Sequence, residues 1–228
     1  MDFLVRSFQA AIFGVIDIRD PLGVGHDVRS ATGDLLDGEP LMLPLPSDAP
    51  SEIPRIVLKS KDERYSCNVS GDRLDLFYRD KKPSRKWIDL RDEYIQHLSA
   101  ISHTLTETRR AIITRLGSIA EFEVPISTSP SLTIRKAYLK EGILPGEQEI
   151  QLGVLHRQSW EAIEINRWVR LRGKEGESVL RVVVDINTIP EKKYDFDVAS
   201  IESFYNYVSS FFVADLEKII LQRSGIET

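Results

Sequence analysis

The chain has 228 residues, of which 42% are hydrophobic, and this is enough for one large domain or for two small domains that share a core. Its 30 Lys and Arg residues and 35 Asp and Glu residues give a net charge of −5, and both signs are scattered along the sequence. A general nucleic-acid-binding protein would carry a basic face, so the composition disfavours that class. The single cysteine, Cys67, excludes an internal disulfide framework and gives little support for a structural zinc site.

The N-terminal segment does not read as a secretory signal, because Asp2 precedes Arg6 and the apolar residues lead directly into Asp17 and Arg19. No run in the sequence approaches the ~20 apolar residues that cross a bilayer. Together with the cysteine count, these features predict a cytoplasmic protein without a membrane partner.

The first half of the sequence predicts a leading strand, a short helix, three further strands and a long helix. The expected bounds are, in that order, 10–18, near 27–36, then 54–60, 64–70 and 73–79, and finally 88–112. The alternation of Tyr65, Cys67 and Val69 indicates a strand with one buried face. Prolines within 40–54 predict an extended loop ahead of the three strands. Apolar residues of the long helix recur every three or four positions, which indicates an amphipathic helix.

The second half predicts the same order of elements. The expected bounds are 117–125 for the leading strand, near 132–139 for the short helix, 149–156, 160–169 and 179–186 for the three strands, and 198–221 for the long helix. Turns are expected at 157–159 and 173–176. Asp197 is a suitable N-cap for the last helix, and Gly225 is a suitable stop.

This pattern predicts an α+β fold of two pseudo-repeats, residues 1–116 and 117–228. Each repeat is expected to be an antiparallel meander with a short helix and a C-terminal long amphipathic helix packed on the sheet. We expect two small sheets with both long helices on one side. The two repeats are expected to pack so intimately that they can be counted as one structural domain. Residue identity between the halves is poor, so the predicted duplication depends on the order of elements alone.

Three stretches also carry a family resemblance: the hairpin segment 53–79, the long helix that leads into 113–122, and 184–186 with the aromatic C-terminal helix. In these stretches the chain resembles an uncharacterised, sporadically distributed family of bacterial proteins. The resemblance implies two halves, each a strand meander with a long helix, and it supplies no activity and no catalytic residues. A patchy distribution implies accessory, mobile or defence loci, phage defence among them.

The spacing of Arg91 and His97 matches the Arg/His motif of the small all-helical HEPN ribonucleases, in which the pair activates the ribose hydroxyl. The motif is short, and the class is all-helical whereas this sequence is rich in strands, so a solvated helix face is the alternative. His103 lies six residues beyond His97, and the two therefore point to different sides of the helix and do not share a metal.

Other polar motifs favour structural roles. Asp72, Asp75, Asp80 and Lys82 loosely match the acidic pattern of metal-dependent nucleases, but the spacing turns two of the carboxylates to opposite faces of a strand. Segment 23–27 lacks the length and the Lys-Ser/Thr ending of a phosphate-binding loop and predicts a turn before a short helix. Cys67 stands at an alternating strand position without a neighbouring base, which favours a buried thiol over a nucleophile.

A group of arginine and tryptophan residues in the second meander is the most suggestive binding feature. Guanidinium and indole groups are common in binding hot spots and can also stack on bases, whereas the alternative is a sheet face covered by the chain's own helix. The group comprises Arg157, Trp160, Arg167, Trp168, Arg170 and Arg172.

No convergent catalytic set is found in the sequence, so an enzyme is the less favoured class. The leading hypothesis is a non-enzymatic binding or assembly subunit that recognises a protein partner, with a nucleic-acid partner or a homodimer as further possibilities. One alternative is a metal-independent ribonuclease that uses Arg91 and His97. A second alternative is a small-molecule sensor with a cavity between sheet and helices. No cofactor and no metal ligand set is predicted.

Overall fold

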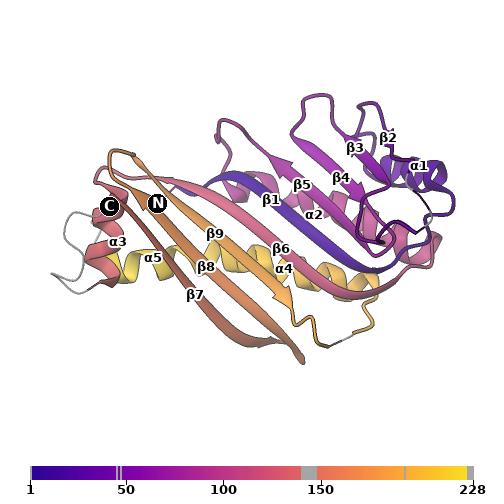
Figure 1. Ribbon diagram of the computed structural model, residues 1–228. Helices are drawn as coiled ribbons and strands as arrows, with labels where there is room; N and C mark the ends of the chain where they lie inside the picture. The colour runs from indigo at the N-terminus through magenta and orange to yellow at the C-terminus, as the bar shows by residue number, and fades with distance from the viewer. Residues whose placement is uncertain (1, 45, 47, 140–147, 193, 225–228) are drawn as a thin grey trace.

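The computed structural model describes the chain except residues 1, 45, 47, 140–147, 193 and 225–228, and except the side chains of 221–224. Within the described residues, nine strands form one antiparallel sheet in the order β2-β3-β4-β5-β1-β6-β9-β8-β7 (Figure 1). The strands are β1 (Leu4–Val15), β2 (Leu41–Met42), β3 (Ile56–Lys59), β4 (Tyr65–Val69), β5 (Arg73–Arg79), β6 (Ile112–Pro125), β7 (Glu149–Trp160), β8 (Ile163–Lys174) and β9 (Val179–Thr188). The α+β class predicted from the sequence is therefore confirmed.

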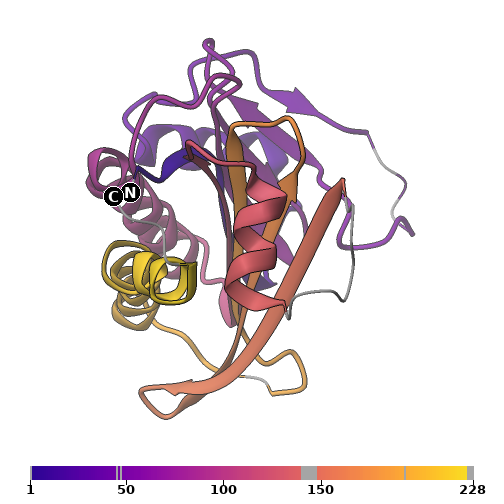
Figure 2. The same cartoon turned by 90° about the vertical axis from the view of Figure 1, so that its left-hand side faces the viewer.

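The helices lie on one side of this sheet (Figure 2). They are α1 (Pro21–Ala31), α2 (Trp87–His103), the π-helical turn η1 (Thr104–Thr108), α3 (Pro130–Tyr138), α4 (Val198–Ala214) and α5 (Leu216–Ser224). The long helices α2 and α4 pack against each other beneath the central strands, α1 packs on β3, and α3 packs on β8. Helices on a single side leave the opposite face of the sheet without a covering layer in the described part of the chain.

The side chains between sheet and helices form the core. On β1 the core-facing residues are Phe8, Ala10 and Ile12, which lie in register with buried residues of both β5 and β6. An aromatic cluster joins the layers, since the rings of Phe8 and Trp87 are 4.5 Å apart and those of Trp87 and Phe212 are 5.3 Å apart. Large aromatic side chains contribute strongly to stability when buried.

Each long helix also places a tyrosine hydroxyl within hydrogen-bond distance of the backbone of β1 and a neighbouring strand. On α2, Tyr94 Oη donates to the carbonyl of Leu76 at 2.5 Å and accepts from the amide of Ala10 at 3.1 Å. On α4, Tyr205 Oη contacts the carbonyl oxygens of Ala11 and Gly117 at 3.1 and 3.2 Å. Both tyrosines are buried, so these bonds fix the helices over the central strands.

The prediction of two small sheets is wrong, because β1 and β6 pair with each other along most of their length and join both meanders. The order β1, α1, β3–β5, α2 is nevertheless followed by β6, α3, β7–β9, α4. Whether this order reflects an internal duplication, and whether the two halves are separate domains, stay predictions.

Three predicted boundaries are also corrected. The helix predicted for 88–112 ends as η1 at Thr108, and the β-branched residues from Ile112 onward belong to β6. The turn predicted at 157–159 lies instead at Glu161, whose φ is +53° and which allows β7 to continue to Trp160. The last predicted helix is divided at Asp215 into α4 and α5. Its N-cap is confirmed, since the Asp197 side chain accepts from the amide of Ser200 at 2.8 Å.

Candidate binding surface

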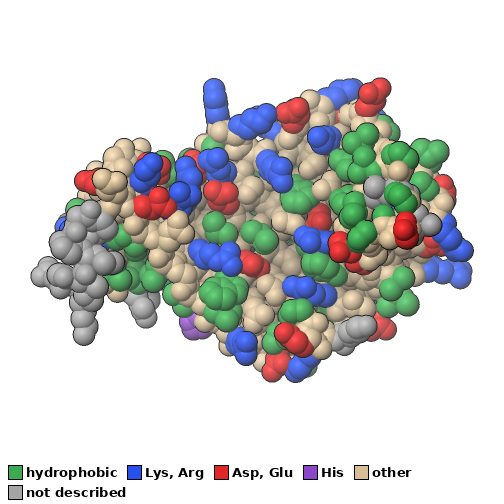
Figure 3. Space-filling model, in the orientation of Figure 1, with side chains coloured by type: hydrophobic (Ala, Val, Ile, Leu, Met, Phe, Trp, Pro, Cys, Tyr) green, Lys and Arg blue, Asp and Glu red, His purple; other side chains and the backbone are tan. Residues whose placement is uncertain are grey.

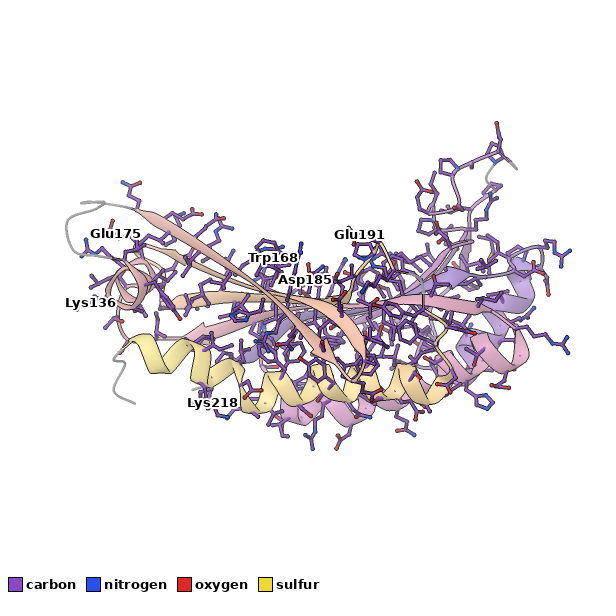
Figure 4. All side chains as sticks on the ribbon, turned by 90° about the horizontal axis from the view of Figure 1, so that it is seen from below. Lys136, Trp168, Glu175, Asp185, Glu191 and Lys218 are labelled. Atoms are coloured by element: carbon purple, nitrogen blue, oxygen red, sulfur yellow. The ribbon has the colours of Figure 1, made fainter. Side chains whose placement is uncertain are left out.

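The uncovered side of the sheet, called the open face below, carries the side chains that alternate with the core residues. Figure 3 looks onto this face and shows Lys and Arg side chains interspersed with Asp, Glu and hydrophobic side chains. Figure 4 shows Trp168 and Asp185 on the side of the sheet opposite α4 and α5. Its residues include Gln9 and Phe13 on β1, Arg73 and Asp75 on β5, Arg115 on β6, Asp185 and Asn187 on β9, and Trp168 and Arg170 on β8.

Three residues from adjacent strands form the centre of the open face. Phe13 lies in register with Arg73 on one side and with Arg115 on the other. The two guanidinium groups stack on the same ring, at 4.7 Å and 4.6 Å from its centroid. A cation over an aromatic face is attracted by the electrons of the ring, so Phe13 holds both cations in place despite their mutual repulsion.

The two arginines differ in their other partners. Arg73 binds the buried carboxylate of Asp75, with its Nη2 at 2.7 Å and its Nε at 2.8 Å from Oδ1, and Gln9 Nε2 donates to the same oxygen at 2.8 Å. Arg115 has no hydrogen-bond or ion-pair partner among the described residues, and its Nε is buried. Burial, followed by the nearby charge of Arg73, lowers the pKa of the Arg115 guanidinium, and the nearby charges of Asp185 and Glu191 oppose this shift. Arg115 is therefore a half-buried cation whose Nε has no hydrogen-bond partner among the described residues.

A second group of open-face residues lies on the neighbouring strands β9 and β8. Trp168 is directly opposite Asp185 in the ladder. Asp185 accepts from Asn187 Nδ2 at 2.8 Å and lies 3.9 Å from the guanidinium of Arg170. Arg170 in turn stacks on Trp168, at 5.4 Å from the ring centroid. Arg73, Phe13 and Arg115, which are in register on β5, β1 and β6, are called the Phe13 row. The side chains on β8 and β9 present an indole and both signs of charge beside this row.

The arginine and tryptophan residues singled out from the sequence do not form one surface. Trp168, Arg170, Arg172 and Arg157 carry their side chains on the open face. Trp160 is 5% exposed and packs in the core against Phe204, with ring centroids 5.3 Å apart. Arg167 also lies on the helix side, where its guanidinium stacks on Phe211 at 4.4 Å. The prediction of a continuous face is wrong because successive residues of a strand point to opposite sides.

Phe13, Arg73 and Arg115 are not recognisable as a site from the sequence alone. The three residues come from three strands, and only the pairing of β1 with β5 and β6 brings them together. A partial signal was present, because each of the three is next to an apolar residue that is buried in the core, namely Ile12, Leu74 and Leu116.

Arg91 and His97, the residues of the predicted ribonuclease motif, have different neighbours on α2. Arg91 Nε donates to Asp92 at 3.0 Å. The His97 ring lies edge-on to Tyr65 at 6.3 Å between centroids, and burial, opposed by the nearby Glu93 charge, lowers its pKa. The structure thus supplies separate local contacts for the two side chains, and ribonuclease activity stays a prediction.

The acidic residues of the loose nuclease pattern are engaged in turns or ion pairs. Asp72 accepts from the hydroxyls of Ser51 and Ser70 at 2.9 Å each, whereas Asp80 accepts from the amide of Lys82 at 3.0 Å. Asp75 is bound by Arg73 and Gln9 as described above. In the part of the chain that the structure describes, no group of three or more His, Cys, Asp and Glu side chains is placed to hold a metal ion.

The remaining sequence motifs have structural positions. The glycine-containing segment 23–27 lies inside α1 instead of forming a turn before it, and the amide of Gly23 donates to the N-cap carboxylate of Asp20 at 3.0 Å. Cys67 is a buried free thiol, as predicted, and burial raises its pKa. A cavity of about 340 Å³ lies between β7, β8 and α5, and whether it binds a small molecule stays a prediction.

No protein-family model matches the chain, and no curated protein is significantly similar to it in sequence. The described helices include none with the length and apolar character needed to cross a bilayer.

Proposed function

We propose that this chain is a non-enzymatic binding or assembly subunit that recognises a protein partner through the open face of its sheet. The observation that carries the proposal is Arg115, which is stacked on Phe13 and has no hydrogen-bond or ion-pair partner among the described residues. A half-buried guanidinium with an unsatisfied N–H costs stability in the free protein. A carboxylate of the partner would bind this guanidinium and remove that cost when the complex forms.

The composition of the open face supports a protein partner over a nucleic acid. Asp75 and Asp185 lie among the arginines, and the chain as a whole carries a net charge of −5. Fixed carboxylates would repel the phosphates that dominate nucleic-acid binding. Aromatic and arginine side chains next to acidic ones are instead typical of the centre and rim of protein interfaces.

The proposal is tested by affinity capture from a lysate of the native host, with the captured proteins quantified by mass spectrometry. The variant Arg115→Ala removes the unpartnered cation, and Arg91→Ala is the matched control, because it removes an arginine from α2 on the other side of the molecule. We expect the wild type and the control to recover the same protein in stoichiometric amount, and Arg115→Ala to recover about tenfold less. Recovery of no stoichiometric protein by the wild type, or equal recovery by all three, would contradict the proposal.

The resemblance to a sporadically distributed bacterial family supports placing this subunit in an accessory or defence locus. The captured partner tests this part of the proposal separately. A partner encoded by a neighbouring gene supports it, and a partner encoded elsewhere among housekeeping genes contradicts it.

A further inference from the structure

The two edges of the sheet differ in length. At one edge stands β2, which has two residues, whereas at the other stands β7, which has 12. Among the described residues no strand pairs with the outer side of β7. Proteins usually shorten, cover or charge an edge strand, because its free amides and carbonyls can pair with another chain. β2 is shortened in this way, but β7 is not.

The hairpin between β7 and β8 determines which backbone groups of β7 point outward. Trp160 is paired with Ile163 across a connection of two residues. In such a hairpin the pair next to the turn is hydrogen-bonded, and hydrogen-bonded and non-bonded pairs then alternate. The odd-numbered residues from Glu149 to Ser159 therefore direct their amides and carbonyls away from β8. Their side chains lie on the open face.

Apolar side chains are exposed at the middle of this edge. Val154 is 44% exposed and Leu155 is 36% exposed, one on each face of the sheet. On the helix side, Leu152 and Val154 border the cavity that extends to Ile219 of α5. An added strand would cover these side chains and fill part of the cavity, as in recognition by strand addition.

The charges of β7 identify a second copy of this chain as the occupant. Glu149 and Arg157 lie on the same face of the strand, four residues to either side of Gly153. Glu149 already accepts from Arg172 Nε of β8 at 2.9 Å, whereas Arg157 has no ion-pair partner among the described residues. If two β7 strands pair antiparallel about a twofold axis at Gly153, each Glu149 stands opposite an Arg157 of the other copy. The same register places Leu152 opposite Val154 and keeps side chains away from the axis. A register centred on Leu155 leaves both charges without a partner in the other copy, so the Gly153 register is favoured.

We infer that two copies of the chain associate through antiparallel pairing of their β7 strands and form one continuous sheet. The dimer extends the open face over both copies. It does not depend on the partner proposed above, because β7 lies at the far edge from the Phe13 row.

Sedimentation equilibrium of the full chain and its variants tests this inference. The wild type is expected to be a dimer. Leu155→Pro removes an outward-pointing amide and no bond to β8, so it should give a folded monomer. Leu155→Thr keeps that amide and is the matched control that stays dimeric. Circular dichroism checks that both variants retain the sheet.

Charge substitutions test the register. Glu149→Arg and Arg157→Glu each place like charges opposite one another at two symmetric positions and should weaken the dimer about tenfold. The double variant restores opposite charges across the axis but not the ion pair of Glu149 with Arg172, so it should recover most of the lost affinity. A monomeric wild type would overturn the inference. Persistence of the dimer in Leu155→Pro would overturn it as well. So would a double variant that dimerises no better than the single variants. Binding of a foreign peptide along β7 by a monomeric wild type would also contradict it and would identify a different occupant.

Discussion

Arg115 lies over the ring of Phe13, with 4.6 Å between the guanidinium carbon and the ring centroid, and this ring contact is its one direct side-chain interaction within the described residues. Arg73, from the strand on the other side of β1, stacks on the same ring but also holds the carboxylate of Asp75. The two arginines thus occupy equivalent places on the open face and differ in what they stabilise.

This difference predicts opposite responses to substitution by methionine. Arg73→Met leaves the buried carboxylate of Asp75 without its cation and should lower the free energy of unfolding by about 1–3 kcal/mol. Arg115→Met removes a cation that makes no hydrogen bond or ion pair among the described residues and should change stability by less than about 1 kcal/mol. Urea unfolding of both variants measures the difference. A larger loss for Arg115→Met than for Arg73→Met would show that Arg115 has a structural role instead.

The tyrosine hydroxyls of the core provide a second matched pair. Tyr205→Phe removes a buried donor from the carbonyl oxygens of Ala11 and Gly117 and should destabilise the protein by about 1–3 kcal/mol. Tyr78 is equally buried, but its hydroxyl has no hydrogen-bond partner in the part of the chain that the structure describes. Tyr78→Phe should therefore be neutral or stabilising. Equal losses in the two variants, measured by thermal unfolding, would refute the role given to the Tyr205 hydroxyl.

Stability should also depend on the protonation of His97. Burial lowers the pKa of His97 below its ordinary value of 6.5, so the unfolded chain binds this proton more readily than the folded chain. The contribution of the neutral ring is fully present above pH 6.5 and is lost as the pH falls from there through the folded pKa. His97→Phe keeps the contact with Tyr65 and should reduce the loss of stability between pH 7 and about pH 5. An unchanged pH profile of the urea midpoint would contradict this assignment.

Cys67 should react with a thiol reagent only when the structure opens. The thiol is fully buried, and burial raises its pKa, so neither access nor thiolate is available in the folded protein. Ser84→Cys adds an exposed thiol and serves as the control. One fast and one slow reacting thiol are expected in that variant. Rapid modification of both in native buffer would show that β4 opens readily.

Local features of the fold were predictable from the sequence, whereas the arrangement of the strands was not. Alternation identified β4 and the burial of Cys67, and the Asp197 cap marked the start of α4. The single sheet follows from pairing between β1 and β6, whose residues are about 100 positions apart, and a period of two does not specify such a partner.

The candidate site was missed for the same reason. Phe13, Arg73 and Arg115 become neighbours through long-range register alone. The arginine and tryptophan group was noticed because its members are close in sequence, yet alternation divides Trp160 and Arg167 from Trp168 and Arg170. Closeness in sequence is therefore a poor guide to a shared surface. Residues two positions apart in a strand share a face, and this spacing is the better guide.

The proposal that the partner binds on the open face is tested most directly by oxidative footprinting of the chain alone and in the captured complex. Phe13 and Trp168 lie on the open face, and Tyr207, half-buried on α4, reports on the helix side. The account predicts that binding protects Phe13 and Trp168 from oxidation while Tyr207 reacts as before. Protection of Tyr207 with unchanged oxidation of Phe13 and Trp168 would contradict it.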